Sequence, residues 1–254
     1  MFCFQCEQTV GCTGCTGNAG VCGKKADTAK LQDELTGALI GLARAVDGAE
    51  TISKRTGQVI IEGLFTTVTN VSFDNTAIEK MIRKVRAEKE RLVPDCGRCQ
   101  SPCGKTDEYD MQQLWNTNED IRSLKSLILF GIRGMAAYAY HANVLNFEDA
   151  EVNRFFCEAL FKIGYEESIE ALLPTVLKVG EINLKCNQLT AQEKNDLWDS
   201  ARNADMEYVP GVTYTVTLDG FIISDNIECV SYEDINTGYS YSDHDPVYLK
   251  FRLK

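Results

Sequence analysis

The chain has 254 residues, of which 44% are hydrophobic, and a formal net charge of −11. This size allows one large domain or two smaller ones, and the hydrophobic content is ordinary for a chain that buries a core. The acidic charge argues against a nucleic-acid partner, and no stretch is long and apolar enough for a membrane span. The N-terminus does not resemble a secretory signal, so we expect a cytoplasmic protein.

The N-terminal segment, residues 1–26, is rich in thiols. Its cysteines are Cys3, Cys6, Cys12, Cys15 and Cys22, out of eleven in the chain. In a cytoplasmic protein such usage indicates metal binding or redox chemistry. Cys3 and Cys6 are separated by two residues and can bind one centre, for which Cys15 and Cys22 can supply two more thiolates. The interspersed glycines would let the backbone wrap a cluster closely.

Spacing alone leaves the identity of this centre open. Four thiolates without histidine suit an iron–sulfur cluster or zinc, and the spacing favours iron–sulfur. Pairing Cys12 with Cys15 would instead give the second knuckle of a zinc site, so the spacing does not decide which of the two binds. Free or disulfide-forming thiols are a third interpretation.

Three helices are predicted after this segment. The first begins at a cap by Asp27 or Thr28 and ends near Val46, because apolar residues recur there at intervals of three and four. A second helix is predicted over 57–70. Asp74 is expected to cap a third over 75–92, which has one apolar and one charged side.

The next stretch, "DCGRCQSPCGKTDEYD", is predicted to be a loop because of its glycines and proline. Its cysteines are Cys96, Cys99 and Cys103. Three such thiols could hold a metal with a fourth ligand from Asp95, Asp107 or Cys157. The alternative is a redox-sensitive or idle loop. No βαβ pattern surrounds the Cys-x-x-Cys pair, so we do not expect a thioredoxin role.

A second set of helices is predicted over 118–145, 148–163 and 166–186, with Pro174 kinking or restarting the last one. His141 is expected to interact with a helix C-terminus rather than with a metal. Cys157 and Cys186 are expected to fill core space. The predicted fold is therefore mainly α: two tandem three-helix bundles that follow an N-terminal Cys-rich loop.

The composition changes after Cys186. A polar stretch is followed by alternating β-branched, aromatic and polar residues over 212–235 and 245–254, which is strand patterning. We therefore divide the chain into a helical domain, 1–186, and a linker with a short β-rich appendage, 187–254. About three strands are too few for an independent sheet, so they are expected to pack on the helices, to form a homo-oligomer by pairing with another chain, or to stay poorly ordered.

The motifs "MFCFQCEQT", "GCTG", "GVCGK" and "NEDIRSLKSLILFGIRGMAAYAYHA" resemble the N-terminal domain of the hybrid-cluster or prismane proteins, the hydroxylamine reductases. The resemblance covers about residues 1–186. It implies two three-helix bundles and one cubane [4Fe–4S] cluster, or a [2Fe–2S] cluster in variants with a longer loop. By position, the implied iron ligands are Cys3, Cys6, Cys15 and Cys22, and Cys12 is spare.

The resemblance also implies a role. In that family the catalytic hybrid cluster is bound by later α/β domains, and the N-terminal cluster passes electrons. We see the family pattern end near Cys186, so we expect an electron-transfer domain of an oxidoreductase, inactive alone, that serves an unidentified redox protein. The alternative is a structural zinc module.

The tail, about residues 208–254, resembles the last strands of the endonuclease/exonuclease/phosphatase superfamily through "SDHDP". That resemblance implies action of His244 and Asp243 on a phosphate, which suits a histidine beside a carboxylate. The superfamily's upstream metal-binding residues have no place in this chain, so a solvated turn is the favoured interpretation. Two families joined near residue 187 would make the chain a chimera.

Overall fold

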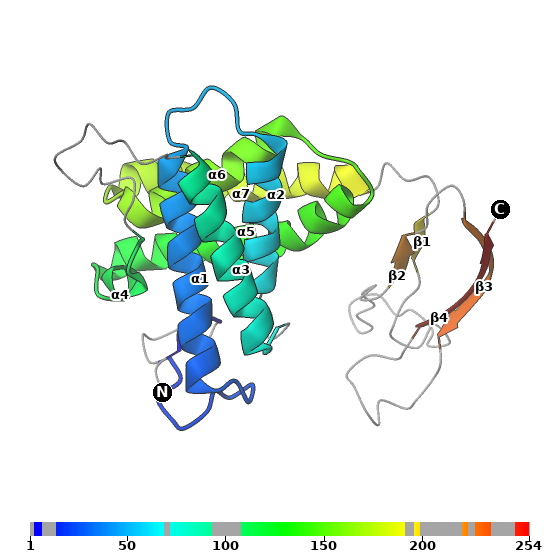
Figure 1. Cartoon of the computed structure of the whole chain (residues 1–254), viewed down its shortest axis with the longest axis horizontal. Coiled ribbons are helices and arrows are strands. Elements are labelled where there is room, and N and C mark those ends of the chain that lie inside the picture. Colours follow the sequence, from blue (N-terminus) through cyan, green and yellow to red (C-terminus); the bar gives the residue numbers. More distant parts are fainter. Residues whose placement is uncertain are drawn as a thin grey trace, which may run out of the picture. The chain divides into compact units, whose positions relative to one another are not determined.

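The structure is a computed structural model that describes residues 3–6, 14–68, 72–92, 108–190, 196–198, 220–222, 227–234 and 247–253 (Figure 1). These residues belong to two compact units, Met1–Thr190 and Ala191–Lys254. The first unit is helical and the second contains the strands. Each unit is described below by itself.

Helices α1 (Ala26–Ala45), α2 (Lys54–Thr66) and α3 (Asn75–Leu92) form the first bundle, and Figure 1 shows them side by side. The predicted bounds of α3 are confirmed, as is its cap, because Asp74 Oδ1 accepts from the backbone N–H of Thr76 at 2.9 Å. For α1 the predicted cap is wrong. Its N-cap residue is Lys25, and Asp27 lies within the first turn.

The second bundle consists of α5 (Glu119–Val144), α6 (Ala150–Tyr165) and α7 (Ile169–Thr190), preceded by the short helix α4 (Met111–Trp115), which the sequence did not predict. Helix α7 does not restart at Pro174, contrary to one predicted outcome. Two side chains bond to the carbonyl of Ala171, which precedes the proline in the same helical turn. Thr175 Oγ1 and Lys162 Nζ both donate to the carbonyl of Ala171, at 3.2 and 3.4 Å.

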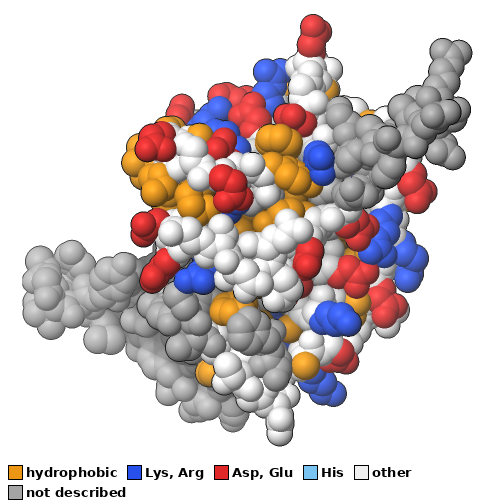
Figure 2. All heavy atoms as spheres, turned by 90° about the vertical axis from the view of Figure 1, so that its left-hand side faces the viewer, with side chains coloured by type: hydrophobic (Ala, Val, Ile, Leu, Met, Phe, Trp, Pro, Cys, Tyr) orange, Lys and Arg blue, Asp and Glu red, His pale blue; other side chains and the backbone are white. Residues whose placement is uncertain are grey.

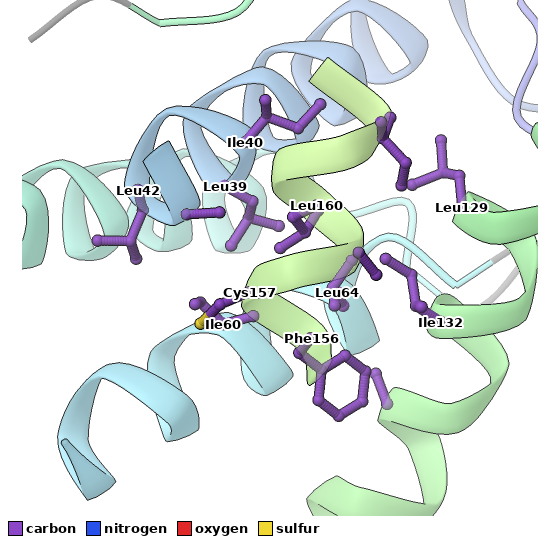
Figure 3. Packing of buried hydrophobic residues seen from close by; sticks show 14 of the residues in the cluster. Leu39, Ile40, Leu42, Ile60, Leu64, Leu129, Ile132, Phe156, Cys157 and Leu160 are labelled. Carbon is purple, nitrogen blue, oxygen red and sulfur yellow. The ribbon is translucent and has the colours of Figure 1, made fainter. Parts of the chain in front are cut away.

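The two bundles share one hydrophobic core. In Figure 3, Phe156 and Leu160 of α6 lie among side chains of α1, α2 and α5, including Leu39 and Leu64. Leu39, Leu64 and Leu160 are fully buried. The predicted pair of three-helix bundles is therefore confirmed, and the bundles pack against each other as one body within this unit.

The helices approach closely where glycine permits it. A Cβ on Gly63 of α2 would lie 2.7 Å from Leu39, and a Cβ on Gly37 of α1 would lie 2.2 Å from the backbone oxygen of Tyr109. Tyr109 donates its N–H back to the carbonyl of Gly37 at 3.3 Å. The segment that leads into α4 is thus held directly against α1.

The surface charges are mixed in sign. Figure 2 shows acidic and basic side chains interspersed over one face rather than gathered into a patch of one sign. Several of these charges form ion pairs between elements: Arg86 contacts both Glu34 and Glu108, and Lys185 contacts Asp149. Exposed pairs of this kind contribute little stability each, so the buried apolar core dominates.

The second unit has two antiparallel two-stranded sheets among its described residues. Strand β1 (Asp196–Trp198) pairs with β2 (Gly220–Ile222), and β3 (Ile227–Asp234) pairs with β4 (Val247–Leu253). The register of the second pair shifts between Cys229 and Ser231. Strand β1 lies in the stretch expected to be a polar linker. Homo-oligomer formation through these strands stays a prediction.

Candidate metal centre

The two halves of the cysteine segment meet at an antiparallel bridge between Cys3 and Cys15. The backbone N–H of Cys15 donates to the carbonyl of Cys3 at 3.0 Å. Gly14 makes this contact possible, since its φ is +54° and a Cβ there would lie 2.8 Å from the Cys3 carbonyl oxygen. Two of the four predicted ligands are thereby joined, although twelve positions separate them in the chain.

A tight turn presents the last predicted ligand, Cys22. Gly20 donates its N–H to the carbonyl of Lys24 at 2.8 Å, and Gly23 donates to Gly20 at 2.9 Å. Gly23 has φ of +82°, a conformation that glycine adopts without strain. Cys22 is exposed, Cys6 and Cys15 are intermediate in exposure, and Cys3 is buried.

Side chains anchor the start of the chain to the helices. The ring of Phe4 packs on that of Trp115 in α4, with centroids 4.9 Å apart. The next residue, Gln5, donates its side-chain amide to Asp33 of α1. The cysteine segment therefore rests on α1 and α4 through consecutive residues.

The end of the segment is anchored to the same helix. Lys24 is buried and donates its ammonium to Gln32 Oε1 at 2.5 Å. The amide of Gln32 donates in turn to the backbone oxygen of Ser72, at 2.9 Å. One face of α1 thus carries a row of buried polar residues spaced four apart: Thr28, Gln32 and Thr36.

The charges around Cys3 are partly balanced. Burial raises the pKa of the Cys3 thiol, while the backbone N–H of Gln5 and the charge of Lys24 oppose that rise. Burial also raises the pKa of Asp33 to about 6, against the charges of Arg133 and Lys24. A metal binds the thiolate, so nearby cations favour the state that a metal requires.

The donor set fits a thiolate-bound centre in its chemistry. The structure brings Cys3 and Cys15 together. Among the residues that it describes, no three or more Cys, His, Asp or Glu side chains are positioned as a ready metal site. The assignment of Cys3, Cys6, Cys15 and Cys22 as a complete ligand set therefore stays a prediction.

The remaining candidate ligands and catalytic residues singled out from the sequence lie either outside the described residues or in the core. Cys96, Cys99 and Cys103 lie outside the described residues, as do Asp243 and His244. Cys157 and Cys186 are buried in the core as predicted, and Figure 3 shows Cys157 among apolar side chains.

Burial raises the pKa of both core thiols to about 12, which makes them poor ligands. His141 lies in the last turn of α5, where its ring contacts Phe65 and Tyr140.

The sequence analysis missed the buried polar residues beside the cysteines. The sequence pattern did not single out Arg133, Asp33 or Gln32. The available signal was the one cation, Arg133, within the otherwise apolar stretch 127–140 of α5, because such a charge is rarely buried without a polar partner.

The raised pKa of Asp33 leads to a prediction for the metal-free protein. The unfolded chain releases this proton near pH 3.8 and the folded chain near pH 6. Folded protein therefore binds more protons between these values, and this residue lowers the free energy of unfolding as pH rises from about 4 to 6. We expect at most about 3 kcal/mol from this residue.

Urea unfolding of wild type and Asp33→Asn across this range measures the effect. As pH rises, the unfolding free energy of wild type should fall relative to that of Asp33→Asn. A difference that does not change with pH would contradict the prediction. Other carboxylates also titrate at acidic pH, such as Glu88, whose pKa is lowered by a hydrogen bond from Arg91. Their contributions to the unfolding free energy are the same in both proteins and therefore cancel in the difference.

The described helical unit thus carries a glycine-spaced set of thiols beside buried cations. Residues 1–215 match the Prismane/CO dehydrogenase family, and the chain belongs to that family. Proteins of this family carry iron–sulfur clusters.

Similar proteins include a hydroxylamine reductase from Thermodesulfovibrio yellowstonii, 39% identical over an alignment of 212 residues that covers 74% of this chain and 39% of that protein. Another, from Maridesulfovibrio salexigens, is 36% identical over an alignment of 206 residues that covers 74% of this chain and 38% of that one. The chain thus spans about two fifths of the length of these curated relatives.

The comparisons correct the interpretation of the tail. The family match continues to residue 215, so the predicted end of the family pattern near Cys186 is wrong. A hydroxylamine reductase from Porphyromonas gingivalis aligns with 96% of this chain, at 31% identity, over 48% of its own length. The predicted chimera and the phosphoesterase resemblance of His244 and Asp243 therefore find no support.

Among the described helices, none has the length and apolar character needed to cross a membrane.

Proposed function

We propose that the helical unit binds one [4Fe–4S] cluster through Cys3, Cys6, Cys15 and Cys22 and passes electrons within an oxidoreductase of the hydroxylamine-reductase type. The observation that carries this proposal is the Cys3–Cys15 bridge, which joins the two halves of the thiol set inside a family whose members hold iron–sulfur clusters. When bound, the cluster supplies a one-electron redox couple.

The chain's own residues have three tasks in this proposal. The thiolates hold the iron, and the backbone amides of the glycine-rich turns are available to the sulfur atoms. Phe4 and Gln5 fix the Cys3–Cys6 pair to α4 and α1. Exposed Cys22 lies at the surface, where an electron donor could approach.

Anaerobic reconstitution of the full chain with iron and sulfide tests the proposal. We expect about four iron and four sulfide per chain, a broad visible absorption, and a paramagnetic resonance signal after reduction. A [2Fe–2S] cluster would give half these amounts. A colourless protein that retains zinc but no sulfide would overturn the proposal in favour of a structural metal module.

A further inference from the structure

Arg133 of α5 is an arginine buried in the helical core, with 3% of its surface exposed. Its Nη2 donates to Thr36 Oγ1 of α1 at 3.0 Å. Its Nε and Nη1 atoms have no hydrogen-bond partner within the part of the chain that the structure describes. Burying N–H groups without acceptors is costly, so this guanidinium is placed for an acceptor beyond Thr36.

The position of Thr36 fixes the guanidinium in one orientation. Its hydroxyl accepts from Arg133 and donates to the backbone carbonyl of Gln32 at 2.8 Å. Because Gln32 also accepts from Lys24, the two buried cations are tied to the same stretch of α1.

The local charge balance indicates what kind of acceptor fits. Arg133 is close enough to Cys3 and Asp33 for its charge to act on both. Burial lowers the pKa of Arg133 to about 10, which leaves it protonated at neutral pH. Two buried cations, Arg133 and Lys24, act on the charge of Asp33 and on the buried thiol of Cys3, and Asp110 is a second carboxyl group that acts on Asp33. A protonated guanidinium with unpartnered N–H groups suits an anionic group held on that thiol.

We propose that Arg133 is a positioning residue for the cluster, and this proposal rests on the proposed iron–sulfur function. Arg133 donates its unpartnered N–H groups to the Cys3 side of the bound cluster and raises the cluster's reduction potential. Four thiolates carry more negative charge than the iron–sulfide core offsets, and reduction adds one more electron. A nearby cation with N–H donors stabilises the reduced state more than the oxidised state.

The midpoint potential of the reconstituted full chain, measured by titration with spin-resonance detection, tests this role. Arg133→Met is expected to disfavour reduction on the order of tenfold, a shift of about 59 mV to more negative potential for one electron. Arg133→Lys keeps the charge and should recover most of the shift. A purely structural role would change the unfolding free energy without moving the potential.

Lys125→Met is the matched control. Lys125 is a buried cation on the same helix, and it bonds Glu167 at 3.1 Å instead of facing the cysteines. Its removal should leave the potential unchanged. Should Arg133→Met fail to fold, Thr36→Val removes the acceptor that orients the guanidinium and should shift the potential in the same direction by less.

The outcomes separate the two proposals. A wild-type chain that takes up no iron–sulfur cluster refutes both. A wild-type cluster whose potential is unchanged in Arg133→Met, or in Thr36→Val when that variant is the one that folds, refutes the role of Arg133 alone. An equal shift in Lys125→Met also refutes it, because the effect would then be general to buried charge.

Discussion

Replacing Cys15 by serine is expected to reduce the iron retained after reconstitution by about tenfold or more. Cys15 is bonded through its backbone to Cys3, so its side chain belongs beside the first pair of predicted ligands. A serine hydroxyl does not ionise at neutral pH as a thiol does and is a poor ligand for iron. Iron, sulfide and visible absorption per chain measure the loss.

Two other cysteines serve as controls. Cys12→Ser tests the ligand that spacing alone could not exclude, and it should retain the cluster if Cys15 is the ligand. Cys229→Ser changes a thiol on β3, in the other unit, and should also retain it. Loss of iron in Cys12→Ser together with retention in Cys15→Ser would show that the ligand set is wrong.

The helices could be predicted because each carries its own pattern. Helix α3 has a capping aspartate, one apolar side and a charged side, and its observed bounds match the predicted ones. Such signals are local: they depend on residues three and four apart and need no knowledge of the rest of the chain.

The short elements could not be predicted in this way. Helix α4 has five residues, and the ring of its Trp115 packs on Phe4, more than a hundred positions earlier. Strand β1 has three residues and exists through its pairing with β2. Pro174 carries a strong local signal against a helix, but α7 continues through it and packs against α5 and α6.

The candidate site likewise contains residues that could be predicted from the sequence and residues that could not. The thiols could be found from their spacing, since two cysteines separated by two residues have a chemical meaning on their own. Arg133 could not be assigned, because its role depends on Thr36 and Cys3, which α1 and the N-terminal segment bring to it. The sequence shows that a buried charge interrupts α5 but does not show what that charge faces.

Gly14→Ala is expected to disturb the cysteine segment in two ways, through backbone strain and through a steric clash. An L-residue at φ of +54° is strained by about 1 kcal/mol. The added methyl group would also lie 2.8 Å from the carbonyl oxygen of Cys3 and 3.0 Å from the ring of Phe4, so the bridge to Cys15 must open. We expect a loss of about 2–3 kcal/mol of unfolding free energy and a clear loss of bound iron.

Gly48→Ala isolates the strain from the contact. Gly48 has φ of +78°, and a Cβ there would meet nothing within 4 Å. This variant should lose only about 1 kcal/mol and should bind iron as wild type does. If both alanine variants retained iron equally, the Cys3–Cys15 bridge would not be needed to assemble the centre. Loss of iron in Gly14→Ala alone would tie cluster assembly to the close approach of these two backbone strands.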